Sequence, residues 1–218
     1  MVHLERVLAK AHRLKSAAAQ GWFYAQQADN RAAAMRRVMW NGQAKVFCDY
    51  QWEQERPSDT VSVATVFPLY FGIATEARAH AVAASLRRTL LEPGGLGTTT
   101  MQSGQQWDRP NGWAPLQWVA INGVAAYGED GLARDIARRW LRRNIDAYEE
   151  SGVLLEKYDV EAAVSHGGGE YPLQVGFGWT NGVLAELMPS IPCRGAPAGR
   201  CCGTIANAVP SRRAQQLG

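Results

Sequence analysis

The chain has 218 residues, 46% hydrophobic and 20% charged, which is the composition of a globular protein with one sizeable core. Its net charge of +3 includes four arginines and no acid after Glu186, which leaves the body near −1 and disfavours a nucleic-acid partner. No apolar run approaches the roughly 18 residues of a membrane span, and residues 1–6 lack the apolar core of a signal peptide. We therefore expect no membrane insertion.

The first two predicted helices form a pair. Hydrophobic spacing predicts one amphipathic helix over residues 3–19, ended by Gly21, and a second over 24–40 that is rich in Ala and Arg. The apolar face of the first helix is expected to carry Leu4, Val7, Leu8, Ala11 and Leu14. An Asn-Gly pair at 41–42 then predicts a turn, followed by a short extended piece at 45–50.

The next segment is ambiguous. Within residues 59–74, alternating valines favour a strand, and Pro68 would break an exposed helix. We interpret the segment as a buried helix capped by Asp59, because the apolar run continues to its end. Residues 76–91 predict another amphipathic helix, ended by a Pro-Gly-Gly turn.

Three more helices are predicted in the second half. The first covers residues 114–127, with a proline in its first turn and Gly128 closing it. Asp130 is expected to cap the second, which ends at Gly152, and the third covers 180–187. One side of the second is expected to carry Leu132, Ile136, Trp140 and Tyr148.

These helices follow one another in pairs, with apolar inner members, amphipathic outer members and long Gly-rich connections. The pattern predicts an all-α fold and fits an α/α toroid as well as a plain bundle. Residues 189–218, rich in Pro, Gly, Ala and Arg, are expected to form a poorly ordered tail after one domain at 1–188.

The cysteines do not predict a metal site. Cys48 stands alone, and the other three lie in the tail without a Cys-x-x-Cys…His pattern. A disulfide from Cys193 to Cys201 or Cys202 stays open in case the chain is exported.

Residues 102–118 hold the chain's most unusual composition. Trp107, Trp113 and Trp118 lie there among amides, a carboxylate and two prolines. Indole faces beside fixed hydrogen-bonding groups suit a sugar ring, which has C–H faces and a hydroxyl rim. A Trp-rich turn that leads into a buried helix is the alternative.

Four stretches together resemble the trehalase family, the inverting glycosidases that split α,α-trehalose. Gln-Trp-Asp-Arg-Pro-Asn-Gly-Trp-Ala-Pro at 106–115 looks like the family's second signature, and Pro-Gly-Gly-Leu at 93–96 precedes it. Glu-Lys-Tyr-Asp at 156–159 and Gly-Gly-Gly-Glu-Tyr-Pro-Leu-Gln at 167–174, which runs on into Gly-Phe-Gly-Trp-Thr-Asn-Gly at 176–182, follow in the family's order. The resemblance covers residues 1–188 and is greatest to periplasmic bacterial members.

The resemblance implies a fold and a reaction. Trehalases fold as an (α/α)6 toroid of six helix pairs, so this chain would supply roughly the C-terminal half. The implied function is hydrolysis of trehalose to two glucose molecules by an inverting acid/base mechanism, with no metal or cofactor. Periplasmic location is also implied. From the residues alone, a plain helical scaffold with no sugar role stays as another class of function.

The resemblance also implies roles for two glutamates. Glu156 matches the position of the catalytic base, and Glu170 that of a substrate contact. Without the resemblance, Glu156 beside a lysine would be interpreted as a solvated surface pair. Glu170 would be interpreted as part of a flexible loop, with His166 just before the glycines as a solvated residue of that loop.

Aromatic and polar side chains would complete the pocket. Trp107, Trp113, Phe177 and Trp179 are expected to form its apolar walls. Gln106, Asp108 and Asn111 would either bind sugar hydroxyls or hold the loop in shape. Val175 departs from the family, which usually has Asp there.

The resemblance places the catalytic acid in a Gly-Trp-Asp segment that would precede residue 1, and this chain contains no such segment. An open half-toroid would expose the apolar faces of its inner helices, which favours poor solubility, self-association or reliance on a separately encoded N-terminal half. The alternative is a truncated, inactive fragment with at most weak sugar binding.

Overall fold

The computed structural model describes residues 1–162 and 169–190. The helices are α1 (Val2–Leu14), α2 (Ala18–Val38), η1 (Val63–Val66, 3-10), α3 (Phe67–Tyr70), α4 (Glu76–Thr89), α5 (Ala114–Ala125), α6 (Asp130–Ser151), α7 (Gly178–Leu187) and η2 (Met188–Ser190, 3-10). The expectations for His166, for the tail cysteines and for the order of the tail beyond residue 190 fall outside the described residues.

Four small antiparallel ladders accompany the helices of this predominantly helical fold. The pairs are β1 (Trp40–Asn41) with β2 (Val46–Phe47), β3 (Tyr50–Gln51) with β4 (Arg56–Pro57), β5 (Leu91–Glu92) with β6 (Gly95–Leu96), and β7 (Asn111–Trp113) with β8 (Lys157–Asp159). Each strand has two or three residues, too few for the alternation that reveals a strand in a sequence.

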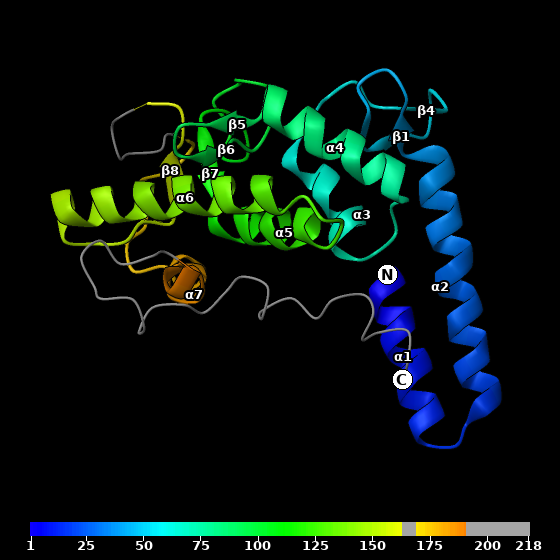
Figure 1. Ribbon diagram of the computed structural model, residues 1–218. Coiled ribbons are helices and arrows are strands. Elements are labelled where there is room, and N and C mark those ends of the chain that lie inside the picture. Colours follow the sequence, from blue (N-terminus) through cyan, green and yellow to red (C-terminus); the bar gives the residue numbers. More distant parts are fainter. Residues whose placement is uncertain (163–168, 191–218) are drawn as a thin grey trace.

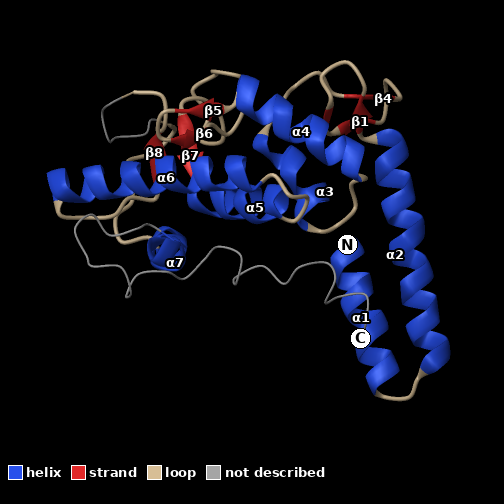
Figure 2. Ribbon diagram, viewed as in Figure 1, coloured by secondary structure: helices blue, strands red, loops and turns tan. Residues whose placement is uncertain are grey.

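Helices α5 and α6 lie side by side at the centre of the body, as Figure 1 shows. Helix α3 packs on α5, and α7 contacts both central helices. Helices α1 and α2 form an antiparallel hairpin that projects from one end of the body, whereas β5 to β8 gather at the other end (Figure 2).

The two central helices differ in sequence as inner and outer helices should. Helix α5 is apolar nearly all round and buries residues on several sides, which is typical of an internal helix. Helix α6 is amphipathic: Leu132, Ile136 and Trp140 are fully buried on one stripe, and the opposite side carries charges. Tyr148, predicted for the same stripe, is exposed instead. Asp130 is the first residue of α6 and makes no capping bond, contrary to prediction.

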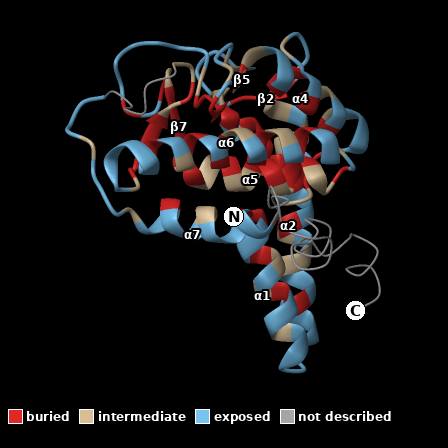
Figure 3. Ribbon diagram, turned by 60° about the vertical axis from the view of Figure 1, so that its left-hand side comes forward, coloured by how far each residue is buried: buried red, intermediate tan, exposed pale blue. Residues whose placement is uncertain are grey.

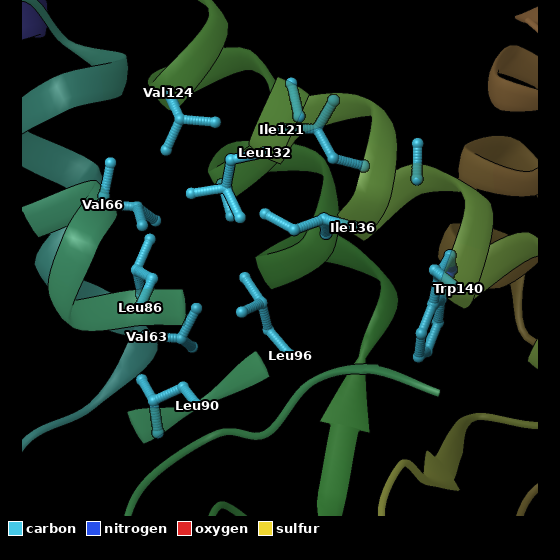
Figure 4. Close-up of a cluster of buried hydrophobic side chains, with 14 of the residues drawn as sticks. Val63, Val66, Leu86, Leu90, Leu96, Ile121, Val124, Leu132, Ile136 and Trp140 are labelled. Atoms are coloured by element: carbon cyan, nitrogen blue, oxygen red, sulfur yellow. The ribbon is translucent and has the colours of Figure 1, made fainter. Parts of the chain in front are cut away.

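One hydrophobic core joins the central helices to α3, α4 and the nearby loops (Figure 4). Its labelled members are Val63, Val66, Leu86, Leu90, Leu96, Ile121, Val124, Leu132, Ile136 and Trp140. Each is at most 2% exposed. This closely packed core supports the short ladders.

The prediction of one buried helix over 59–74 was wrong. The backbone stays extended as far as Ser62, which bridges Thr99, and a 3-10 turn and the short α3 follow. Pro68 lies in the first turn of α3, where its missing N–H has no consequence. Asp59 is exposed and pairs with Arg56 instead of capping a helix.

The first helix also ends earlier than predicted. It stops at Leu14, and Gly21 lies inside α2 rather than at a helix end. A Cβ on Gly21 would lie 2.9 Å from Arg13 Cγ and 3.2 Å from the Ala9 carbonyl oxygen. Glycine at this position therefore allows the two helices to approach closely.

The expected apolar face of α1 does not pack against the body. Leu4 and Val7 are about half exposed, and Leu14 is 78% exposed. Figure 3 shows exposed positions along much of α1. The face against α2 buries Val2 and Ala9 and also Glu5, whose carboxylate accepts three hydrogen bonds from Arg31 Nε and Nη2 at 2.8–3.1 Å. A pairing with a charged residue on another helix cannot be read from hydrophobic spacing.

The remaining predicted elements are confirmed within a few residues. Asn41 makes the predicted turn, since its side-chain oxygen accepts hydrogen bonds from the amides of Gln43 and Ala44. Gly128 and Gly152 close α5 and α6 with φ of 78° and 73°. Across residues 1–162 and 169–190, we find no helix with the length and apolarity that a bilayer crossing requires.

Candidate active site

The β7–β8 ladder brings together two stretches that lie more than forty residues apart in the sequence. Its register places Trp113 opposite Lys157 and Gly112 opposite Tyr158. Successive residues of a strand point to opposite faces. Gly112 and Tyr158 face the core, where the Tyr158 ring meets Trp140 edge to face at 5.4 Å. Trp113 and Lys157 face the other side, where the site is formed.

The Pro-Gly-Gly-Leu stretch at 93–96 supports this ladder on its core side. Its β5–β6 hairpin is fastened to α5 by Gln117, which is fully buried. The Gln117 side chain accepts a hydrogen bond from the Leu96 amide at 2.9 Å and donates one to the Leu96 carbonyl at 2.7 Å. Gly95 has a φ of 128° and lies directly against the Gln117 amide, so a side chain there would be strained and displaced.

Glu156 lies just before β8 and is 3% exposed. Its Oε1 accepts a hydrogen bond from the Tyr171 hydroxyl at 3.0 Å, and its Oε2 lies 3.3 Å from Lys157 Nζ. Its amide donates to the Gln174 carbonyl at 2.9 Å, and its carbonyl accepts from Trp179 Nε1 at 3.3 Å. Backbone and side chain are therefore both held.

The Glu156–Lys157 pair is not the solvated surface pair that the residues alone would suggest. The Lys157 side chain is completely buried, and its Nζ lies 5.3 Å from the Trp113 ring centroid and 4.6 Å from that of Tyr171. Burial raises the pKa of the Tyr171 phenol, and the hydrogen bond to Glu156 and the charges of Glu156 and Glu170 raise it further. Tyr171 therefore stays protonated and donates to the carboxylate.

Tryptophans form a stacked wall beside this carboxylate. Trp107 and Trp113 stack with ring centroids 3.9 Å apart and an interplanar angle of 11°, and Trp179 meets Trp113 edge on at 5.8 Å. Trp107 is 49% exposed and Trp179 36%, whereas Trp113 is 1% exposed. The outer face of the wall is thus offered by Trp107 and Trp179, and Trp113 lies behind them. Trp118 packs against the core instead.

The Asp108 side chain points toward the backbone of its own loop. Its carboxylate accepts hydrogen bonds from the Ser103 hydroxyl, at 2.7 Å, and from the Ser103 amide. Burial raises the pKa of this carboxyl, but these bonds and those from the Gly104 and Gln105 amides outweigh it and lower the pKa overall. Of the two roles left open by the sequence, this geometry favours holding the loop in shape.

Glu170 lies over the same loop. Its Oε2 accepts a hydrogen bond from the Gln106 amide at 3.4 Å, and the residue is exposed. Gly169, with a φ of 141°, lies against the Gln106 side chain, so that a Cβ would fall 2.6 Å from Gln106 Cδ. The charges of both Glu156 and Glu170 raise the pKa of the Tyr171 phenol, and Glu156 also accepts its hydrogen bond.

Several residues of this region were not singled out from the sequence. Lys157 and Tyr171 directly follow the two glutamates in the sequence, and this adjacency could have indicated that they belong to the site. Arg109 donates to both carboxylate oxygens of Glu161 at 2.7 and 2.9 Å and so ties the two motifs together. No sequence pattern distinguishes that bidentate pair from a surface pair. Among the described residues, no group of three or more His, Cys, Asp or Glu could hold a metal ion.

The layered helical body is consistent with part of an α/α toroid, and it carries a buried carboxylate beside stacked indoles at one end. The Trehalase family model matches residues 1–192, and this chain belongs to the trehalase family.

Relatives and solved structures agree with this assignment. The chain is 48% identical to the periplasmic trehalase of Pseudomonas aeruginosa over 189 residues, 86% of this chain and 34% of the relative. It is 46% identical to that of Xanthomonas oryzae over 199 residues, 91% of this chain and 35% of the relative. The chain therefore spans about a third of the length of these relatives.

Among solved structures, the neutral trehalase Nth1 from Saccharomyces cerevisiae matches 89% of this chain and 36% of its own, with a TM-score of 0.69 and 26% identity. A GH63 mannosylglycerate hydrolase from Thermus thermophilus matches 85% of this chain and 44% of its own, with a TM-score of 0.61 and 19% identity. This second similarity concerns the fold alone.

Proposed function

We propose that this chain contributes the base side of a site that hydrolyses α,α-trehalose to two glucose molecules with inversion. In such a reaction, the base removes a proton from a water molecule, whose oxygen forms a bond to the anomeric carbon. The bond from that carbon to the bridging oxygen breaks on the opposite side, and an acid protonates the leaving glucose. One glucose is released as the β anomer and the other as the α anomer.

Glu156 is the proposed base. The observation that carries this role is a carboxylate, 3% exposed and contacted by the Lys157 and Tyr171 side chains, at the edge of a stacked tryptophan wall. Trp107 and Trp179 are proposed as the sugar platform and Glu170 as a hydroxyl acceptor, with Trp113 behind the platform. Asp108 is proposed to act indirectly, through the shape of the loop.

The acid partner is proposed to come from outside this chain. Inverting glycosidases need two carboxyl groups roughly 6.5–9.5 Å apart, so that the water fits between them. The rest of the site would be supplied by sequence equivalent to the part of the relatives that this chain does not span, either joined to it or separately encoded. Because those relatives are named periplasmic trehalases, we propose the periplasm as the place of action.

A chimera tests this function directly. In the chimera, this chain replaces the matched third of the P. aeruginosa relative, and glucose release from trehalose is followed. We expect turnover by the chimera, and a loss of about 10²–10⁴-fold in kcat for Glu156→Gln, since one proton transfer is removed. Glu149→Gln, an exposed change in α6, is the matched control. Normal turnover by Glu156→Gln would reject its role as base.

The alternative is that the chain is inert and binds sugar only weakly. This alternative concerns the 218 residues taken alone, which align with about a third of each of these relatives. Calorimetric titration of the 218-residue chain with trehalose, combined with a glucose assay of the same sample, distinguishes the two. Measurable turnover by the chain alone would remove this alternative.

A further inference from the structure

We propose that Lys157 is a positioning residue for the reaction: its buried ammonium, held between two aromatic rings, fixes the Glu156 carboxylate in its productive orientation. This inference rests on the proposed function of Glu156 and deepens it. It assigns a role to a lysine that would otherwise count only as a neighbour of the base.

The Lys157 ammonium is a cation that is costly to bury. The Lys157 side chain has no exposed surface, and a buried ammonium is strongly unfavourable unless it is paired. Within residues 1–162 and 169–190, its one ion-pair partner is Glu156, at 3.3 Å. A fold that needed only stability would do as well with an apolar side chain of similar volume, because buried ion pairs add little net stability. The presence of this costly pair at the candidate base is therefore better explained by a role in the site than by stability alone.

Two aromatic rings hold the Lys157 ammonium in place. The β7–β8 register sets Lys157 opposite Trp113, and the ammonium lies over the Trp113 and Tyr171 rings at 5.3 and 4.6 Å. Aromatic faces attract cations within about 6 Å of the ring centroid. Two rings from separate segments thus restrict the ammonium to one place.

Lys157 also restricts the position of the Glu156 carboxylate. Lys157 contacts Oε2 and the Tyr171 hydroxyl donates to Oε1, so the two oxygens of Glu156 are held from two sides. The same Trp113 ring supports the stacked Trp107 platform. Lys157 therefore couples the position of the base to the position of the sugar wall, and an error of about 1 Å in such a position can cost about 10²-fold in rate.

The test uses three variants of the chimera: Lys157→Met removes the charge, Lys157→Arg keeps it, and Lys10→Met is the exposed control on α1. We expect Lys157→Met to lower kcat by about 10²-fold with KM almost unchanged, because the lysine acts on the base and not on the sugar. Lys157→Arg should recover much of kcat, and Lys10→Met should match the parent. Equal kcat for Lys157→Met and the parent would overturn the proposal, as would equal losses in the Met and Arg variants.

Non-additivity separates positioning from a purely structural role. If Lys157 acts through Glu156, adding Lys157→Met to Glu156→Gln should not lower the residual turnover further. A full additional loss would contradict the proposal. Should Lys157→Met fail to fold, Lys157→Gln replaces it; failure of both to fold while Lys157→Arg folds would assign the lysine a structural role and overturn the inference.

The outcome for Glu156→Gln keeps the two proposals distinguishable. If that variant turns over normally, the proposed function of Glu156 fails. If it is inactive while Lys157→Met is fully active, only the inference about Lys157 fails.

Discussion

Gly112 offers a sharp test of how the two motifs are joined, because the ladder leaves no room for a side chain there. A Cβ added at this position would fall 3.0 Å from the Leu96 carbonyl oxygen and 3.3 Å from Trp140 Cζ3, and closer still to Val160 Cγ1. The backbone carbonyl and the fully buried indole cannot move away easily. Gly112→Ala should therefore push β7 away from Leu96, Trp140 and Val160.

The expected cost follows from the number of rigid neighbours. Inserting one methyl group into a well-packed region typically costs about 1–3 kcal/mol. Three close contacts, two of them with rigid groups, place Gly112→Ala in the upper part of this range, at about 2–3 kcal/mol. For a chain of this length, that corresponds to a decrease of roughly 4–12 °C in Tm.

Urea unfolding of the 218-residue chain, followed by circular dichroism, measures this cost. Gly131→Ala is the matched control, because Gly131 lies exposed in the first turn of α6 with its nearest neighbour 3.9 Å away. That change should stabilise the chain by up to about 1 kcal/mol through helix propensity. Adding Val160→Ala to Gly112→Ala should cost less than the sum of the two single changes.

Two results would refute this reasoning about the ladder. One is a stability of Gly112→Ala equal to that of the parent chain. The other is strict additivity with Val160→Ala, which would mean that the two positions do not compete for space.

Three further predictions concern other parts of the molecule. Trp107→Ala removes a half-exposed stacking partner worth about 0.5–1.5 kcal/mol, and in the chimera it should raise KM for trehalose several-fold; an unchanged KM would exclude the platform role. The hydrogen bond from Arg31, with its charge, lowers the pKa of Glu5, so this pair should stabilise the α1–α2 hairpin above the unfolded pKa of about 4.3 and lose that effect as pH falls through the lower folded value. Thermal melts between pH 6 and 2 should accordingly show a weaker pH dependence for Glu5→Gln than for the parent, and equal dependences would contradict the assignment. Burial, and then the charges of nearby acids, raise the pKa of the Cys48 thiol, so with the tail cysteines replaced by serine, alkylation at pH 8 should be slow until urea unfolds the chain.

The sequence predicted the long helices because their periodicity is strong. Helices α4, α5 and α6 have a clear apolar face or a fully apolar sequence and end at glycines or near a Pro-Gly-Gly turn. Local signals failed where distant contacts decide the structure. The backbone before Ser62 is extended because it pairs with Thr99, and Gly21 continues a helix because α1 passes close to it.

The sequence indicated which residues lie in the site, but not which of them are exposed and which are buried behind them. The motifs indicated the region of Glu156, Glu170 and the tryptophans, and the structure places them at one end of the molecule. Which indole lies in front depends on the stacking of Trp107 over Trp113, and this is set by the ladder register rather than by neighbours in the sequence. Complete burial of Lys157 likewise follows only when Trp113 and Tyr171 are brought together.

The central claim is that Glu156 activates the water that attacks the anomeric carbon. The most direct measurement is the proton NMR spectrum of the first products that the chimera forms from trehalose, before the anomers equilibrate. We predict equal amounts of α- and β-glucose from the parent chimera, and formation of both anomers slowed by about 10²–10⁴-fold in Glu156→Gln. Formation of β-glucose by Glu156→Gln at the parent rate, or of α-glucose alone by the parent, would contradict the account.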